Sequence, residues 1–283
     1  MRINPYITQR IAFLFLFLST LVIIIPVVLI TGMILKNGLS ALNWEFITAN
    51  PRLGMRAGGI FPAIVGTTYL VVGTMLFALP IGIFAAVYLC EYAKGNWLTR
   101  MIDIAIVNLA GVPSVVYGLF GLGLFVEFLN FGTSILSGSL TLGVMSLPVI
   151  ITASREALGT VPQSFREVSL ALGATKWQTT RRVVLPNALP GILTGTILAL
   201  SRATGETAPI LFTVAAFYLP HLPTSIFDQC MALPYHLYVI STQVPKIKPH
   251  IQYGTALVLI LMVMALNLAA IVIRAHFRKR KQW

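Results

Sequence analysis

The sequence predicts an all-α membrane protein with six transmembrane helices and with both termini in the cytoplasm. Hydrophobic residues make up 57% of the 283 residues and charged residues only 10%, whereas a typical soluble domain carries about 25% charged residues. Six apolar runs are also long enough to cross a bilayer, because a spanning helix needs about 20 residues. The chain therefore has too little polar surface for a soluble globule.

The first three predicted spans carry no charge. Residues 11–35 form a run that is too long for the apolar region of a signal peptide, and Pro26 predicts a kink within it. Residues 60–90 form the second span and residues 104–126 the third.

The last three predicted spans differ from one another in polarity. An uncharged run covers residues 128–154, and its helix is expected over residues 136–154 because the preceding stretch is rich in turn residues. The fifth span, residues 188–211, contains two charged side chains, and the sixth covers residues 253–273.

The distribution of basic residues predicts the orientation. With the N-terminus inside, 14 Lys and Arg residues lie at cytoplasmic ends and only 5 lie outside. Cytoplasmic loops of membrane proteins carry such an excess. The net charge of +12 is thereby explained without nucleic acid, and the basic tail, residues 276–283, is expected to meet anionic lipid headgroups.

Residues 160–190, between the fourth and fifth spans, carry signals for two short helices. The pattern Ser164-x-x-Glu167 is a capping box that predicts a helix over residues 165–172. Gly173 stands where a C-terminal glycine belongs. The sequence therefore predicts a rigid helix pair on the cytoplasmic face, suited to docking a soluble partner, although a connector without a partner would look the same.

A second capping box begins the other helix of this segment. Thr175 and Gln178 have the spacing of that motif, and the helix is expected to run to about Leu185, where Pro186 stops it. A DNA-binding helix-turn-helix would show similar signals, but its position between two membrane spans argues against that role.

The segment also contains a longer spaced pattern. It reads Glu167-Val168-Ser169, three residues, Gly173, nine residues and then Val183-Val184-Leu185-Pro186. It resembles the coupling loop of permease subunits of binding-protein-dependent ABC importers, which have the MetI-like, type I importer fold. The resemblance implies that residues 160–190 contact a separate ATPase through four residues, which are Glu167, Gly173, Leu185 and Pro186. No G-x-x-x-x-G-K-[ST] phosphate loop occurs in the sequence.

Two charges interrupt the fifth span. Arg202 and Glu206 are four residues apart and are expected on one helix face. Arg202 lies about 16 Å along the helix from Gly191, which is near the middle of a core about 30 Å thick. A charge at that depth costs at least about 2.5 kcal/mol, so it is usually functional. We expect both residues to line an anion path; a structural ion pair is the alternative.

Small residues recur every four positions along the same span. Such a stripe lets helix backbones approach closely in lipid. We expect it to form a packing seam with another span or with a second subunit; its members are Gly191, Gly195, Ala199 and Ala203.

Three further segments, residues 58–62, 111–118 and 202–209, resemble those of phosphate importer permeases of the PstA type. The resemblance covers about residues 58–275 and implies an importer domain over that range, preceded by residues 1–57 with the first helix and its outer loop. It implies a bacterial inner (plasma) membrane location. It also implies four partners, which are a PstC-like permease subunit, two copies of a PstB-like ATPase that uses ATP and Mg, and a PstS-like phosphate-binding protein.

Other functions fit the sequence less well. A permease for sulfate or molybdate would need a similar positive path, and an ATPase-independent carrier or channel would not need a docking loop. An intramembrane enzyme would need paired acids or a metal motif such as H-E-x-x-H, so no catalytic residue, metal site or bound cofactor is predicted. The outer segment, residues 216–252, reads as an interfacial loop or a docking surface, because it is rich in Pro and aromatic residues.

Overall fold

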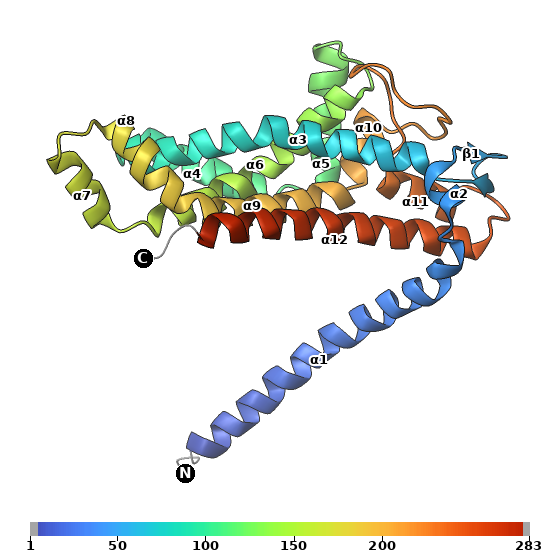
Figure 1. Ribbon diagram of the computed structural model, residues 1–283, viewed down its shortest axis with the longest axis horizontal. Helices are drawn as coiled ribbons and strands as arrows, with labels where there is room; N and C mark the ends of the chain where they lie inside the picture. The colour runs from blue at the N-terminus through green and yellow to red at the C-terminus, as the bar shows by residue number, and fades with distance from the viewer. Residues whose placement is uncertain (1–4, 280–283) are drawn as a thin grey trace.

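The computed structural model describes residues 5–279, and long helices lying side by side dominate it (Figure 1). The predicted all-α class is confirmed. The long helices are α1 (Pro5–Gly38), α3 (Phe61–Val87, continued by the π-helical turn η2, Tyr88–Tyr92), α6 (Ile135–Gly159), α9 (Leu185–Gly205) and α12 (Pro249–Lys279). Of the predicted basic tail, α12 includes residues 276–279, and residues 280–283 lie outside the described part.

The first helix stands apart from the others. Figure 1 shows α1 diverging from the bundle, which it meets near Gly38, where the glycine lies against Tyr253 of α12. Helix α1 continues through Pro26 as one helix, and the kink predicted at this residue stays a prediction. Prolines are tolerated within membrane helices when local adjustments satisfy the carbonyl group that the proline leaves unbonded.

Helix α3 and helix α6 run in the same direction. Gly73 lies against Ser139 and Gly82 lies against Ile150, so residue numbers rise together along the contact. Because the two helices are parallel, the chain must return across the bundle between them.

A bent pair of helices makes that return. Helix α4 (Trp97–Ala110) is followed by α5 (Ser114–Gly121) and the π-helical turn η3 (Leu122–Phe128), with a bend of 107° between the two parts. The predicted continuous helix over residues 104–126 is therefore wrong. The cause is Pro113, which cannot bond to the carbonyl four residues earlier and clashes with it. Within residues 5–279, five helices are long and apolar enough to cross a membrane, and the bent pair brings this number to the predicted six if it counts as one crossing.

Short elements occupy the outer end of the bundle. Pro51 pairs with Gly58 in a two-stranded antiparallel hairpin. The elements are η1 (Leu39–Ala41), α2 (Trp44–Thr48), β1 (Pro51–Arg52), β2 (Ala57–Gly58), α10 (Ala208–Thr213) and α11 (Leu233–Thr242).

The outer segment does not behave as one interfacial loop. Its part from residue 230 to residue 240 re-enters the bundle, where Leu233, Val239 and Ile240 are fully buried. The backbone N–H of Leu233 donates to Thr67 Oγ1 of α3 at 2.8 Å. The interfacial prediction is therefore wrong for this part, because its apolar residues fill space between the spans.

The small-residue stripe of α9 faces α6 of the same chain. Gly191 lies against Ala157 and Gly195 lies against Ala153, so these helices are antiparallel and their backbones are close. Gly195, Ala199 and Ala203 are buried, and Gly191 is exposed. Helix α9 is thereby held in register against α6.

Replacing Gly195 with Leu should destabilise the protein, because the new side chain would clash with Ala153. Overpacking of this kind costs about 1–3 kcal/mol. The measurement is the thermal unfolding midpoint in detergent. Gly32→Leu is the matched control, since no atom lies within 4 Å of a Cβ built at Gly32 in α1. Equal midpoints for the two variants would contradict this packing.

Candidate functional site

A helical hairpin projects from one end of the bundle, beyond the ends of α3, α6 and α9 (Figure 1). It consists of α7 (Gln163–Ala171), α8 (Lys176–Thr179) and the π-helical turn η4 (Thr180–Val184), and we refer to residues 163–184 as the hairpin. The positive-inside distribution puts this end in the cytoplasm.

The first helix of the hairpin begins differently from the prediction. Helix α7 starts at Gln163 with Pro162 as its N-cap, and no side chain caps it. The predicted capping box of Ser164 and Glu167 is therefore wrong. A capping residue needs a non-helical backbone, and Ser164 already lies inside the first turn.

The turn between the helices is a Schellman motif centred on Gly173. Its φ is +83°, in the left-handed region that glycine adopts without strain. The N–H of Gly173 donates to Leu170 O at 2.9 Å and that of Ala174 donates to Ser169 O at 3.2 Å. The predicted C-terminal glycine is confirmed, and its two bonds satisfy carbonyls at the end of α7.

The second capping box is present with both of its bonds. Thr175 N donates to Gln178 Oε1 at 2.8 Å, and Gln178 N donates to Thr175 Oγ1 at 3.2 Å. The predicted helix end at Pro186 is wrong, because α8 continues through η4 into α9 as one continuous helix of 30 residues, Lys176–Gly205. The wider π turn accommodates the proline within the helix.

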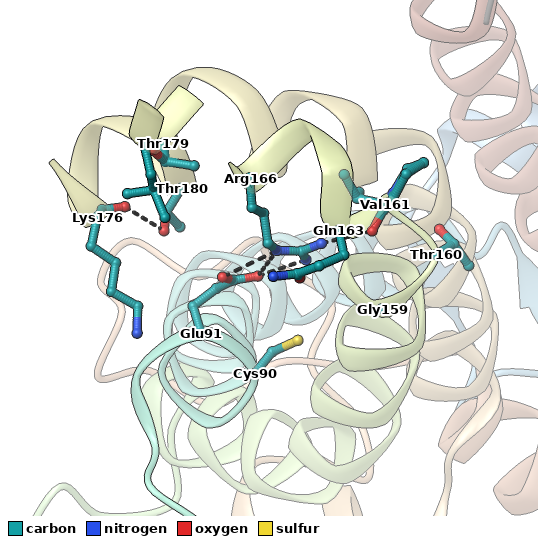
Figure 2. A pocket seen from close by; sticks show the side chains of 12 residues that line it. Cys90, Glu91, Gly159, Thr160, Val161, Gln163, Arg166, Lys176, Thr179 and Thr180 are labelled. Carbon is teal, nitrogen blue, oxygen red and sulfur yellow. Dashed lines mark hydrogen bonds and ion pairs between the residues drawn. The ribbon is translucent and has the colours of Figure 1, made fainter. Parts of the chain in front are cut away.

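A buried ion pair anchors the hairpin to the bundle (Figure 2). Arg166 Nη2 lies 2.8 Å from Glu91 Oε1, and Arg166 Nε donates to the same oxygen at 3.1 Å. The side chains are only 13% and 9% exposed. This two-point geometry uses the planar fork of arginine, and it joins α7 to η2, 75 residues away in the sequence.

The same guanidinium also binds the end of α6. Arg166 Nη1 donates to Val161 O at 2.7 Å, and Nη2 donates to Leu158 O at 2.9 Å. One side chain thus ties together the cytoplasmic ends of α3, α6 and α7. A cavity of about 580 Å³ lies beside it, with Cys90 and Lys176 in its lining.

The hairpin exposes large apolar side chains among its polar ones. Leu172 is 83% exposed, and the other exposed apolar side chains are Val168, Leu170 and Trp177. Of the residues expected to contact an ATPase, Glu167 and Gly173 are exposed on the hairpin. Leu185 and Pro186 are partly buried where α9 begins, and Leu185 packs on the core.

The charged pair of the fifth span lies at a helix break. Helix α9 ends at Gly205, and Glu206 has an extended backbone, with ψ of 134°. The predicted continuous helix over residues 188–211 is therefore wrong. A helix that continued would bring Pro209 into conflict with the carbonyl of Gly205, and the chain resumes as α10.

Arg202 and Glu206 remain together across this break. Arg202 Nε lies 3.2 Å from Glu206 Oε1, and 42% of the arginine side chain is exposed. Next to Arg202 in sequence, Ser201 bonds to Asn267 near the middle of α12. Ala199, one turn earlier, is buried with Ile150 near the middle of α6. The pair therefore lies at mid-depth in the bundle.

The breaks in the third and fifth spans pack against each other. Pro113 leaves the carbonyl of Leu109 without its helical partner, and Tyr117 Oη donates to that oxygen at 2.7 Å. A Cβ added at Gly118 of α5 would lie 3.1 Å from the backbone of Pro209. The carbonyl that Pro113 frees is thus bonded within the chain, whereas Gly111, Pro113 and Gly205 at the two breaks are exposed.

Among residues 5–279, no group of three or more His, Cys, Asp and Glu side chains is placed to hold a metal ion. In the same range both cysteines are free, with Cys90 exposed and Cys230 buried.

The ion pair of Glu91 and Arg166 did not follow from the sequence. Glu91 reads there as an interfacial acid at the end of an apolar run. The sequence shows only that Glu91 precedes a cytoplasmic loop that contains Lys94 and Arg100. This position does not identify a partner 75 residues away.

Comparison with known proteins identifies relatives over almost the whole chain. Residues 78–283 match the family described as "Binding-protein-dependent transport system inner membrane component". The chain is 35% identical to the "Probable ABC transporter permease protein YqgI" of Bacillus subtilis, over 94% of this chain and 95% of that protein. It is 36% identical to the "Phosphate transport system permease protein PstA 1" of Mycobacterium tuberculosis, over 98% and 90%.

Solved structures share the fold at lower identity. A subunit of the MetNI methionine ABC transporter matches with a TM-score of 0.60 and 18% identity, over 77% of this chain and 97% of that one. A chain of a bacterial ABC transporter for alginate import matches with a TM-score of 0.66 and 14% identity, over 95% and 96%.

Replacing Gly173 with Val should loosen the hairpin. No atom lies within 4 Å of a Cβ at this position, so the cost is backbone strain of about 1–2 kcal/mol. Hydrogen–deuterium exchange of peptides from residues 163–184 should become faster. Gly173→Asn is the matched control and should have a smaller effect, because Asn tolerates the left-handed region. Unchanged exchange in the Val variant would argue against a required left-handed turn.

Proposed function

Because this chain belongs to the family of binding-protein-dependent transport system inner membrane components, we propose that it is the permease subunit of an ATP-driven importer of inorganic phosphate. It is a multi-pass protein of the bacterial inner membrane, and its six crossings form the transmembrane domain. Transport, rather than a reaction on a substrate, is its role in this proposal.

The hairpin is the observation that carries the proposal. It is rigid, it has an exposed apolar surface around Leu172 and Trp177, and it contains the spaced pattern of the ABC importer coupling loop. A carrier that works without an ATPase has no need for such a docking element. We propose that Glu167 and Gly173 lie on the contact with the ATPase, and that Leu185 and Pro186 hold the junction of the hairpin with α9.

The choice of phosphate has two supports. Relatives at 36% identity have names that include phosphate transport. At mid-depth, Arg202 contacts Glu206 through Nε, and its planar fork suits two-point binding of an oxyanion. We propose that Glu206 holds Arg202 when the path is empty and releases it to a passing anion. Sulfate or molybdate is the alternative substrate, since a positively charged path would bind these oxyanions too.

The partners that we propose are those of a phosphate importer. A PstC-like permease subunit would complete the path, and two copies of a PstB-like ATPase would hydrolyse ATP with Mg. A PstS-like protein would deliver phosphate at the outer end. This chain would bind no cofactor of its own. Closure of the ATPase dimer would draw the two hairpins together and open the path outward, and hydrolysis would reset it.

Reconstitution of the whole complex tests this function. Vesicles that contain both permease subunits and the ATPase should take up radiolabelled phosphate only when ATP and the binding protein are supplied. Excess sulfate or molybdate should compete weakly. Uptake by this chain alone would support an ATPase-independent carrier. Competition by sulfate or molybdate that is stronger than competition by unlabelled phosphate would show that the other oxyanion is the substrate.

Replacing Arg202 with Ala should lower phosphate uptake by at least about tenfold, because a hydrogen bond to a charged group contributes about 1.5–3 kcal/mol. The complex should still assemble, since the side chain is partly exposed. Arg202→Lys should be intermediate, as it retains charge without the fork. Arg274→Ala is the matched control, because Arg274 also contacts α9, at Thr194, but lies near the cytoplasmic end. Normal uptake by Arg202→Ala would remove Arg202 from the path.

A further inference from the structure

We propose that Glu91 and Arg166 form the joint through which movement of the hairpin reaches α3. The inference rests on the proposed function, because a joint of this kind matters only if an ATPase moves the hairpin. It assigns positioning roles to two residues that lie on neither the anion path nor the exposed face of the hairpin.

The π-helical turn at the end of α3 holds both hairpin helices. Glu91 binds Arg166 of α7, and the next residue, Tyr92, lies under Lys176 of α8, with Nζ 5.1 Å from the ring centroid. Within the hairpin, the hydroxyl groups of Ser169 and Thr179 are 2.9 Å apart. The hairpin is therefore fixed to η2 at two places and is braced internally, so it can move with η2 as one unit.

The connections through Arg166 supplement those of the covalent chain. The hairpin follows α6 directly and leads into α9 without a break, so these helices are joined to it in any case. Helix α3 has no such link in sequence, and Glu91 supplies it. Below the joint, α3 packs along α6, with Gly82 against Ile150 and Gly73 against Ser139. A displacement at η2 would thus extend past the middle of the bundle.

Because the Glu91–Arg166 pair is buried, the two side chains are restricted to the arrangement in which they contact each other. With 13% and 9% exposure, water cannot readily replace either partner, and removal of one leaves a buried charge without compensation. The Asp103–Arg155 pair offers a contrast at the same end. It joins α4 to α6, its side chains are 35% and 36% exposed, and it does not include a hairpin residue.

The test measures coupling and not only activity. In vesicles with the full complex, Glu91→Gln should leave the ATPase bound and active, because the exposed face of the hairpin is unchanged. The amount of phosphate imported per ATP hydrolysed should fall at least about twofold, in line with a coupling energy carried by one contact. Asp103→Asn, which also removes one carboxylate, should keep the wild-type ratio.

A covalent replacement of the joint separates positioning from general stability. In a background with Cys90 and Cys230 replaced by Ser, Glu91→Cys with Arg166→Cys should show a low ratio. Linking the two thiols with a short bifunctional methanethiosulfonate should restore it. A wild-type ratio in Glu91→Gln, or a ratio that stays low after linking, would overturn the joint.

A distance measurement tests the joint independently of whether phosphate is the transported substrate. Spin labels on exposed positions of α7 and α3 should give a broader distance distribution in Glu91→Gln than in the wild type, and an unchanged distribution would count against the joint. If wild-type vesicles hydrolyse ATP but import no phosphate, the proposed cargo fails, and the spin-label comparison still decides whether the joint exists.

Discussion

In a lipid bilayer, every backbone N–H and C=O must find a partner within the protein, and the rest of this structure depends on that constraint. Long helices satisfy it by themselves. Where the helices break, at Pro113 and before Pro209, other parts of the chain contact the broken segments. Tyr117 binds the carbonyl of Leu109, and α5 packs against α10. The two breaks thus pack against each other, and Arg202 and Glu206 lie at mid-depth beside one of them.

Outside the lipid, the hairpin is stabilised by local polar motifs. The hairpin folds through a Schellman turn at Gly173 and a capping box at Thr175, both of which are local polar motifs. Such motifs make a small unit rigid without a core of its own. Its exposed apolar side chains are then free to meet another protein, and its buried face is anchored to η2.

The two charge pairs next to these features have different environments. Arg166 is enclosed and uses its fork on Glu91 and on two carbonyls, so its position is strongly determined. Arg202 makes a single-point contact with Glu206 and is partly exposed. A buried, saturated arginine suits a mechanical connection, whereas an accessible one suits a transient ligand. This contrast is why we assign positioning to the first pair and anion contact to the second.

The sequence by itself determined the helical class, the approximate positions of the apolar segments, and the glycine turn and second cap of the hairpin. These follow from composition and from motifs a few residues long, and such signals are local. Only the tertiary structure decided that residues 230–240 enter the core, that Pro186 does not end a helix, and that Glu91 meets Arg166. The physical reason is that each of these outcomes depends on what packs against the segment. Partners 75 residues apart leave no periodic trace in the sequence, and a proline breaks or bends a helix according to its surroundings.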